Sequence, residues 1–261
     1  MKPRGAPLSG RRVVITRPSG QAAGLAGLIA AEGGDPVGIP AIEIRDLADP
    51  APLHAVADRL ESFDLAVFVS RNAVRKALEL LRARRAGRPW PPRLRVATVG
   101  QGSRAELQAQ GFADVIAPPA QSDSEALLAL PELADVRGKR VVIFRGDGGR
   151  KLLGDVLEER GAIVEYAECY RRVRPEEGER LRREWTQGID AVTVSSGEGL
   201  ANFLAMLGED SVRRMSGIPL FVPHARVAEE AARRGLAGAI VAGPRDAEVV
   251  AALVAHFGAA G

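Results

Sequence analysis

The stretch RRVVITR at residues 11–17 decides the fold, because a close copy, KRVVIFR, stands at residues 139–145. A second matching pair follows, with FDLAVFVS at residues 63–70 and IDAVTVSS at residues 189–196. A third pair covers residues 95–116 and 219–240. The offsets are 128, 126 and 124 residues, always in the same order. So steady an offset predicts a tandem, degenerate repeat of one structural plan.

Short runs rich in Val and Ile alternate with longer helical patterns along the chain, which is typical of βα units around mostly parallel sheets. A chain of 261 residues is long enough for two such domains. The fold class is therefore predicted to be α/β. Strands are expected at Arg12–Thr16, Asp35–Ile39, Leu65–Val69, Arg95–Val99, Asp114–Ile116, Arg140–Phe144, Ile163–Ala167, Ala191–Val194, Leu220–Val222 and Ala239–Val241.

Each half of the repeat also contains a long extended segment without a helical pattern, at residues 36–47 and 163–174. These segments occupy matching places in the repeat. They could cross between two domains as strands that pair with each other, or each could be one ordinary strand followed by a loop. The residues alone favour neither interpretation.

The composition excludes several classes of protein. Aromatic residues make up only 4% and the net charge is +3, which argues against a base-stacking nucleic-acid module. The most basic tract, residues 82–93, is interpreted as a solvated loop. A single cysteine, Cys169, and three histidines far apart in sequence predict neither a disulfide nor a metal site. No membrane span, and no signal peptide in residues 1–12, is predicted, so we expect a cytoplasmic protein.

Turns rich in glycine, serine and arginine follow six of the predicted strands, and each turn precedes a helix. Ligands of open α/β sheets bind at the carboxyl ends of the strands, where helix N-termini and arginines favour an anion. Taken singly, each serine is most simply an N-cap and each arginine a solvated charge. Together they predict an anion-binding site, and its candidate residues are Thr16, Arg17, Ser70, Asn72, Gly102, Ser103, Arg145, Gly146, Arg150, Ser195, Ser196, Gly197, His224 and Arg226.

One of these turns, residues 100–105, also matches the dinucleotide motif G-x-G-x-x-A. The strand after it offers no acidic residue that could hold a ribose. A nucleotide-dependent transferase therefore ranks below a protein that binds another anion.

No nucleophile–base pair or carboxylate dyad stands out, so a reaction would depend on one proton donor and on positioning. Tyr170 is the candidate, because a tyrosine hydroxyl can act as a general acid. The alternative is a strand tyrosine that packs its ring and hydrogen-bonds locally. Cys169, next to it, is expected on the opposite face of the strand as a small buried hydrophobe.

Taken in order, these pieces resemble the uroporphyrinogen-III synthase family over nearly the whole chain. The pieces that carry the resemblance are VITRP (14–18), FVSRNAV (68–74), VGQGS (99–103), FRGDGGR (144–150), YRR (170–172), VSSGEGL (194–200) and VPHARVAE (222–229). The resemblance implies two flavodoxin-like domains joined by a two-stranded ladder. Residues 1–40 with 173–261 would form one domain and residues 41–172 the other, with the active-site cleft between them.

The resemblance also implies the reaction. Hydroxymethylbilane, a linear tetrapyrrole with eight carboxylates, closes to uroporphyrinogen III with ring D inverted and water lost, without a cofactor. Tyr170 would be the catalytic proton donor. Ser70, Ser103, Ser196 and Gly197 match turns that meet the substrate, Arg17, Arg145 and Arg150 match recurrent basic positions, and His224 and Arg226 match one bacterial version of their turn. Ser103 replaces a common threonine and Arg71 a common proline.

The expected partner is therefore this small-molecule substrate, handed over by the deaminase that makes it. Neither nucleic acid nor a membrane is an expected partner, and the chain is expected to be a monomer. The alternative function is a non-catalytic, two-lobed module that binds a tetrapyrrole or another anion.

Overall fold

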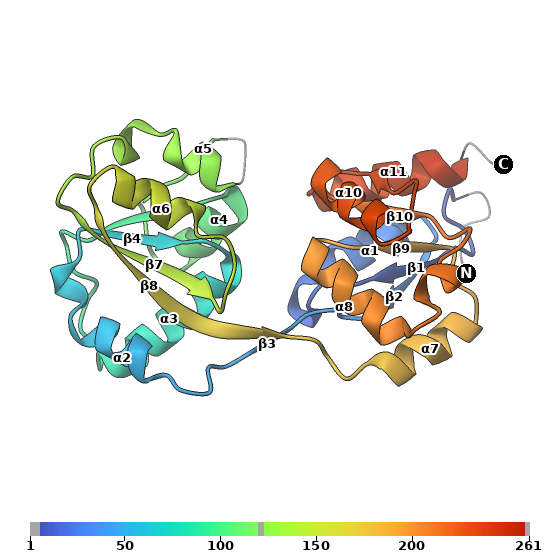
Figure 1. Ribbon diagram of the computed structural model, residues 1–261, viewed down its shortest axis with the longest axis horizontal. Helices are drawn as coiled ribbons and strands as arrows, with labels where there is room; N and C mark the ends of the chain where they lie inside the picture. The colour runs from blue at the N-terminus through green and yellow to red at the C-terminus, as the bar shows by residue number, and fades with distance from the viewer. Residues whose placement is uncertain (1–5, 120–122, 259–261) are drawn as a thin grey trace. The chain divides into compact units, whose positions relative to one another are not determined.

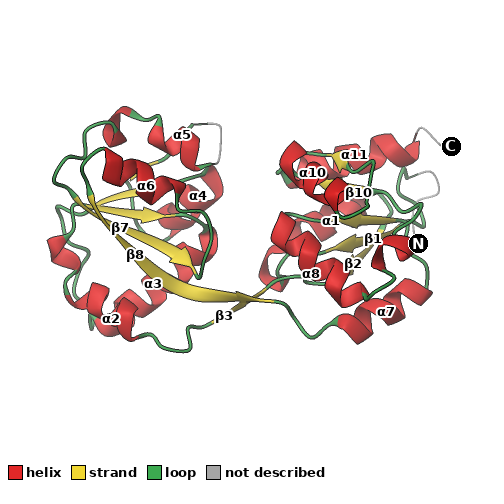
Figure 2. Cartoon of the chain, viewed as in Figure 1, coloured by secondary structure: helices red, strands yellow, loops and turns green. Residues whose placement is uncertain are grey.

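The computed structural model describes residues 6–119 and 123–258, and the chain divides into two compact units. Unit 1 consists of Met1–Glu43 with Val173–Gly261, and unit 2 consists of Ile44–Arg172. Residues 1–5 of the N-terminal stretch considered above lie outside the described residues. Each unit has one sheet with helices on both faces (Figure 1), and most of the remaining chain forms loops between them (Figure 2).

Unit 1 contains a five-stranded sheet in the order β11-β10-β9-β1-β2, paired in parallel. Numbered in chain order within the unit and read from β2, the strands follow the order 2-1-3-4-5, which is the flavodoxin-like order. Its strands are β1 (Arg12–Ile15), β2 (Asp35–Gly38), β9 (Ala191–Thr193), β10 (Leu220–Val222) and β11 (Ile240–Val241). Its helices are α1 (Ala23–Ala31), α7 (Gly178–Thr186), α8 (Gly197–Leu207), α9 (Ser211–Arg214), α10 (Ala225–Arg233) and α11 (Asp246–Gly258), with a 3-10 turn at Ser19–Gln21.

Unit 2 contains a six-stranded sheet in the order β3-β8-β7-β4-β5-β6. The pairings from β8 to β6 are parallel. Numbered in chain order without β3, these five strands follow the order 5-4-1-2-3, which is the flavodoxin-like order 2-1-3-4-5 after circular permutation. Its strands are β3 (Glu43–Arg45), β4 (Leu65–Phe68), β5 (Arg95–Thr98), β6 (Val115–Ile116), β7 (Arg140–Gly146) and β8 (Ile163–Val173). Its helices are α2 (Ala51–Asp58), α3 (Arg71–Arg84), α4 (Gln101–Ala109), α5 (Ser124–Leu128) and α6 (Leu152–Glu159), with 3-10 turns at Leu60–Ser62 and Pro131–Leu133.

Strand residues alternate between two cores in each unit, as a sheet covered on both faces requires. In unit 2, Ala66 and Phe68 pack with helices α2, α3 and α4, whereas Leu65 and Val67 pack with α5 and α6. In unit 1, Val14 packs with α7, α8 and α10, and the neighbouring Ile15 packs with α1 and α11. The apolar strand runs thus hold the sheets, and the strand ends remain for polar residues.

The predicted α/β class with two parallel sheets is confirmed, and each of the ten predicted strands is present. Strand β8 is longer than predicted, because the residues after Ala167 remain hydrogen-bonded along the sheet. Strand β3, its neighbour at the edge, lies within the extended segment 36–47. The interpretation of residues 82–93 as a solvated loop is wrong in part. Residues 82–84 belong to helix α3, and Arg85 is buried and donates to the carbonyls of Ala57 and Pro89.

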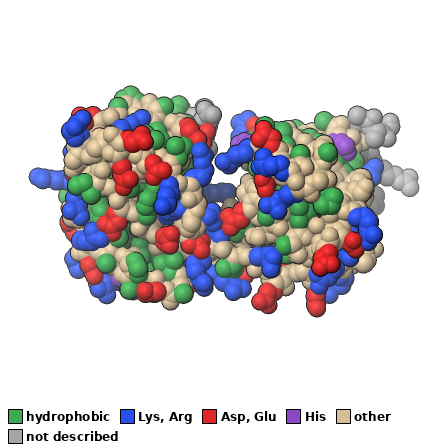
Figure 3. All heavy atoms as spheres, viewed as in Figure 1, with side chains coloured by type: hydrophobic (Ala, Val, Ile, Leu, Met, Phe, Trp, Pro, Cys, Tyr) green, Lys and Arg blue, Asp and Glu red, His purple; other side chains and the backbone are tan. Residues whose placement is uncertain are grey.

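The surface seen in Figure 3 carries basic and acidic side chains interspersed over both units. Within the described part of the chain, no helix combines the length and the apolar character needed to cross a membrane.

Candidate active site

A serine and a tyrosine hydroxyl meet where the central strands of unit 2 end. Ser70 follows β4 and is the N-cap of α3, so its Oγ accepts the backbone N–H of Ala73 at 3.0 Å. The hydroxyl of Tyr170 lies 3.1 Å from the same Oγ. Tyr170 is 4% exposed, and burial raises the pKa of its phenol, an effect that the Ser70 hydrogen bond only partly offsets. The phenol is therefore held in its protonated form at neutral pH.

A register shift in the β7–β8 pairing places the tyrosine ring against the last residue of β7. Arg145 is paired with Glu168, but the next residue, Gly146, is paired with Tyr170, so Cys169 is an extra residue in β8. A Cβ on Gly146 would stand 2.6 Å from Cε2 of the Tyr170 ring. Glycine is thus required at position 146 because the ring of Tyr170 fills the space that a side chain would need.

The same shift corrects the expectation for Cys169. Cys169 is a small buried hydrophobe, as predicted, but it packs in the same core as Tyr170 rather than on the opposite face. Strict alternation fails here because of the extra residue. The thiol donates to the carbonyl of Ala167, and burial raises its pKa to about 12, so it is an unreactive neutral group.

Arg145, next to Gly146, is a buried cation to which the described part of the chain offers no carboxylate partner. It is 7% exposed, its Nε donates to the carbonyl of Gly146, and its guanidinium carbon lies 4.9 Å above the ring of Tyr166. Within the described residues no Asp or Glu lies within ion-pair distance of it. Buried charges are normally paired, so an unpaired one at a strand end is suited to an anionic ligand.

Tyr166 supports this arginine from below. Its hydroxyl donates to the carbonyl of Lys151, and a Cβ on Gly154 would collide with the same hydroxyl. Burial raises the pKa of Tyr166, so the ring offers a neutral face to the cation. The sequence reasoning missed this residue; its one signal was a second tyrosine in the strand of Tyr170.

The glycine-rich turn after β7 is fixed by its neighbours in β8. Asp147 Oδ1 accepts the backbone N–H of Arg172, and the backbone N–H of Gly148 donates to Glu168. Gly149 has φ +93°, and a Cβ there would stand 3.0 Å from Nη2 of Arg145. Arg150 lies farther along, half exposed, in an ion pair with Glu125 at 2.6 Å.

The turn that begins α4 lies beside the turn that begins α3. Gly100 is the extended N-cap of α4, and Ser103 is buried in its first turn. A Cβ on Gly102 would stand 3.5 Å from Cδ of Arg71, so that arginine covers the glycine. Asn72 occupies the first turn of α3. The structure thus brings Ser70, Gly102 and Tyr170 together at the carboxyl ends of the central strands of the unit 2 sheet.

In unit 1, the turn after β1 is engaged in internal contacts. The hydroxyl of Thr16 is buried and donates to the carbonyl of Thr193 at 2.9 Å. Arg17 forms an ion pair with Asp246 at the start of α11. Both side chains therefore already have partners within the unit.

The other two turns of unit 1 are more open. Ser196 is the N-cap of α8 and accepts the backbone N–H of Gly199 at 3.0 Å. Ser195 is exposed, and Gly197 begins the helix. His224 is the extended N-cap of α10, and Arg226 in its first turn is exposed and has no ion-pair partner among the described residues.

The described residues contain no group of three or more His, Cys, Asp or Glu side chains placed to hold a metal ion. Taken together, the fold and the strand-end turns define the class: α/β proteins of two flavodoxin-type units. In this chain one unit holds a buried phenol and a buried arginine that no described carboxylate pairs.

Within this class, the chain belongs to the uroporphyrinogen-III synthase family, since the family model described as "Uroporphyrinogen-III synthase HemD" matches residues 23–251. The uroporphyrinogen-III synthase of Salmonella typhimurium is 37% identical over 193 residues, which cover 72% of this chain and 76% of the relative. That of Escherichia coli K12 is 32% identical over 200 residues, covering 75% and 79%. The predicted family is confirmed.

Solved structures agree on the fold. A mutant uroporphyrinogen III synthase from the extremely thermophilic bacterium Thermus thermophilus has a TM-score of 0.62 at 19% identity, covering 96% of this chain and 98% of its own. The uroporphyrinogen-III synthetase of Helicobacter pylori has a TM-score of 0.61 at 14% identity, covering 94% and 99%.

Proposed function

We propose that this chain catalyses the reaction of its family, in which hydroxymethylbilane closes to uroporphyrinogen III with ring D inverted and one water lost. The observation that carries the proposal is the hydrogen-bonded pair of Tyr170 and Ser70. The pair lies at the carboxyl ends of the strands of a flavodoxin-type sheet, where ligands of such sheets bind. This pair supplies a protonated acid beside a hydroxyl group that can stabilise its anion.

Tyr170 acts in the first step. The C–O bond of the ring A hydroxymethyl group breaks as the phenol proton moves to the departing oxygen, and water leaves. The ring A nitrogen donates its electron pair into the ring as this bond breaks, which gives a protonated azafulvene whose positive charge lies on the nitrogen. The phenolate that forms is stabilised by the Ser70 hydroxyl at 3.1 Å and by the positive charge of Arg172, which favours the ionised form.

The later steps depend on positioning. The substituted carbon of ring D attacks the azafulvene methylene and forms a spiro intermediate. One carbon–carbon bond of that intermediate breaks and ring D recloses through the other carbon, after which the proton lost from the ring returns to the phenolate. The bilane closes unaided to the type I isomer, so the enzyme must hold one conformer and accelerate its closure.

The eight carboxylates of the substrate give the strand-end turns their role. Arg145 is the main anion contact in unit 2, because it is buried and no carboxylate among the described residues pairs with it. Ser103, Gly102, Asn72 and Arg150 are further contacts of that unit. In unit 1 the corresponding contacts are Ser195, Ser196, Gly197, His224 and Arg226, with Thr16 and Arg17 in the turn after β1. Backbone N–H groups at helix N-termini suit carboxylates.

We further propose that the protein works in the cytoplasm as a monomer and receives its unstable substrate from the deaminase that makes it. A reduced, buried Cys169 is consistent with that compartment. Light scattering on the purified chain measures the oligomeric state, and a dimer would overturn that part of the proposal.

The test of function is direct. The purified chain is given freshly made hydroxymethylbilane, and the oxidised porphyrin isomers are separated by chromatography. We expect mainly the type III isomer. Only type I product, as in the reaction without enzyme, would overturn the proposal, and tight binding of uroporphyrinogen without turnover would instead assign a non-catalytic binding module.

A further inference from the structure

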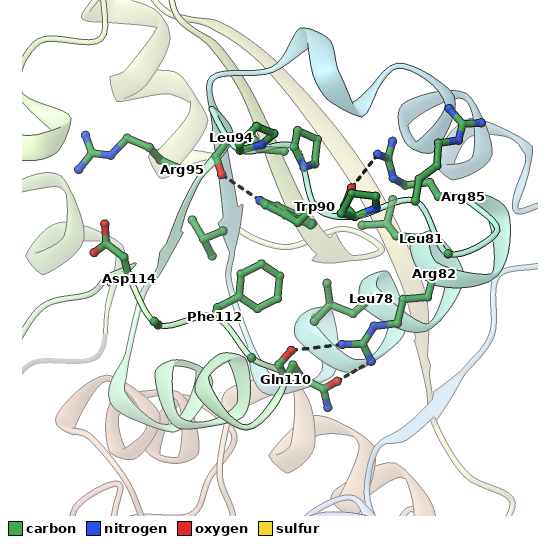
Figure 4. A pocket seen from close by; sticks show the side chains of 18 residues that line it. Leu78, Leu81, Arg82, Arg85, Trp90, Leu94, Arg95, Gln110, Phe112 and Asp114 are labelled. Carbon is green, nitrogen blue, oxygen red and sulfur yellow. Dashed lines mark hydrogen bonds between the residues drawn. The ribbon is translucent and has the colours of Figure 1, made fainter.

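We propose that unit 2 has a second binding site, for a planar aromatic anion, at the amino ends of β5 and β6. This pocket, called the Trp90 pocket here, has a volume of about 610 Å³ and is lined by Trp90, Phe112, Leu78, Leu81, Arg82 and Arg88 among others (Figure 4). Small-molecule sites are mainly apolar clefts of about 300–1,000 Å³ that hold a few placed polar groups. The pocket is lined by Arg95, where β5 begins, whereas Ser70 lies at the end where the parallel strands finish. The pocket and Ser70 are therefore at opposite ends of the strands.

The middle of the pocket is aromatic. Trp90 and Phe112 meet edge to face, with ring centroids 5.0 Å apart, and Phe68 lies 6.4 Å from Trp90 beneath them. The indole N–H of Trp90 already donates to the carbonyl of Leu94 at 2.9 Å. The tryptophan therefore offers ring surface rather than a hydrogen bond, and ring surface favours a flat, apolar group.

One side of the pocket is basic. Arg85 is paired with Glu61, but Arg82 donates only to the side-chain amide and carbonyl of Gln110, which carry no charge (Figure 4). Among the described residues, neither Arg82 nor Arg88 has a carboxylate within ion-pair distance. Two exposed guanidinium groups beside an aromatic surface suit a ligand that joins a ring to an acid group.

The repeat provides an internal comparison, because unit 1 has a pocket of about 640 Å³ at the matching place beside β10 and β11. Its lining is mainly aliphatic, with Met215, Ile218 and Leu236 beside the imidazole of His256, and its arginine, Arg213, is paired with Asp210. The fold therefore accounts for the space in both units. It does not account for Trp90 and Phe112, nor for two arginines without a carboxylate partner among the described residues, which line the pocket of unit 2.

The experiment uses the full chain with Trp185→Phe, so that Trp90 is the sole tryptophan. The probe is 8-anilino-1-naphthalenesulfonate, and its matched uncharged counterpart is N-phenyl-1-naphthylamine. Energy transfer from Trp90 to either probe reports binding close to the indole. We expect saturable binding of both probes, with the sulfonate bound more tightly.

Arg82→Gln combined with Arg88→Gln should weaken sulfonate binding about tenfold, the effect of losing roughly one charge-assisted hydrogen bond, and leave the neutral probe unchanged. Arg82→Lys with Arg88→Lys should restore most of the affinity. Arg213→Gln is the matched control in unit 1 and should change neither probe. Because Arg82 and Arg88 are exposed, these variants should keep the fold. An unchanged near-UV circular dichroism spectrum checks this.

Non-saturable energy transfer would overturn the proposal. An equal loss of affinity for both probes in the Arg82→Gln, Arg88→Gln variant would also overturn it. Two sources of the ligand share this chemistry, an aromatic phosphate and an aromatic carboxylate. Displacement of the sulfonate by AMP assigns the first and displacement by 1-naphthoate assigns the second, whereas displacement by neither would overturn the site.

Discussion

Ser70 in unit 2 and Ser196 in unit 1 begin their helices in the same way. They are 126 residues apart in the repeat, both have extended backbones, and each accepts the third backbone N–H of its helix at 3.0 Å. What stands beside them differs. Tyr170 hydrogen-bonds to Ser70, whereas the residue 128 positions before Tyr170 is Ile42, which is buried near Gly199 in the first turn of α8.

A second pair of matching residues differs in the same direction. Arg17 and Arg145 are 128 residues apart and both end the stretch that defines the repeat. Asp246 neutralises Arg17, but no described carboxylate neutralises Arg145, which lies on Tyr166 instead. Local sequence thus sets the shape of a strand-end turn, and the neighbouring strand and helix decide its chemistry. We infer that unit 2 holds the reacting groups and that unit 1 contributes binding contacts.

The largest effect should come from removing the phenol. Tyr170→Phe keeps the ring against Gly146 and removes the proton donor, so kcat for closure should fall about 100-fold, within the range of general acid catalysis. Ile42→Val is the matched change in unit 1 and should leave kcat within about twofold, since it deletes one methylene and removes no proton donor. Stopped-flow measurement of closure checks both. Equal losses of kcat in the two variants would contradict the assignment of the reacting group to unit 2.

Replacing the unpaired arginine comes next. Arg145→Gln should raise KM about tenfold, because a charge-assisted contact to a carboxylate is lost. The variant should not lower the free energy of unfolding, since an uncompensated buried charge is removed. The control, Arg17→Gln, leaves Asp246 without its partner and should instead destabilise the fold with a smaller change in KM. Steady-state kinetics and urea unfolding separate the two, and a larger KM change for Arg17→Gln would contradict the assignment.

The two N-cap serines test the comparison most symmetrically. Ser70→Ala and Ser196→Ala should each lower the free energy of unfolding by about 1 kcal/mol, as the loss of an N-cap does. Only Ser70→Ala should also lower kcat, by about fivefold, because it removes the partner of the phenolate. Urea unfolding and initial rates on the same samples give both quantities. If kcat fell equally in both variants, the loss of the N-cap alone would explain it, and a role for Ser70 as partner of the phenolate would be contradicted.

Tyr166 should give the smallest effect. Tyr166→Leu removes the ring beneath Arg145 and should raise KM about threefold, in keeping with one cation–π contact. Tyr166→Phe retains the ring and should behave as wild type apart from the lost hydrogen bond to Lys151. A change in kcat rather than KM would contradict a positioning role for this residue.

The sequence was sufficient to predict the α/β class, all ten of the expected strands and the turns at their ends, because Val/Ile runs and the repeat report on local structure. It also identified Tyr170 as the candidate acid. It could not predict the extra residue in β8, which changes the face of Cys169, because the shift arises from pairing with β7. Nor could it separate Arg17 from Arg145, since the partner of Arg17 lies 229 residues away in α11.

The central claim is that Tyr170 of unit 2 gives its proton to the leaving hydroxyl. The most direct test compares hydroxymethylbilane with its aminomethyl analogue, whose ammonium group leaves as ammonia and needs no added proton. Single-turnover closure of both substrates is measured for the wild-type chain and for Tyr170→Phe. The account predicts a loss of about 100-fold with the hydroxymethyl substrate and almost none with the aminomethyl substrate. Equal losses with both substrates would contradict it.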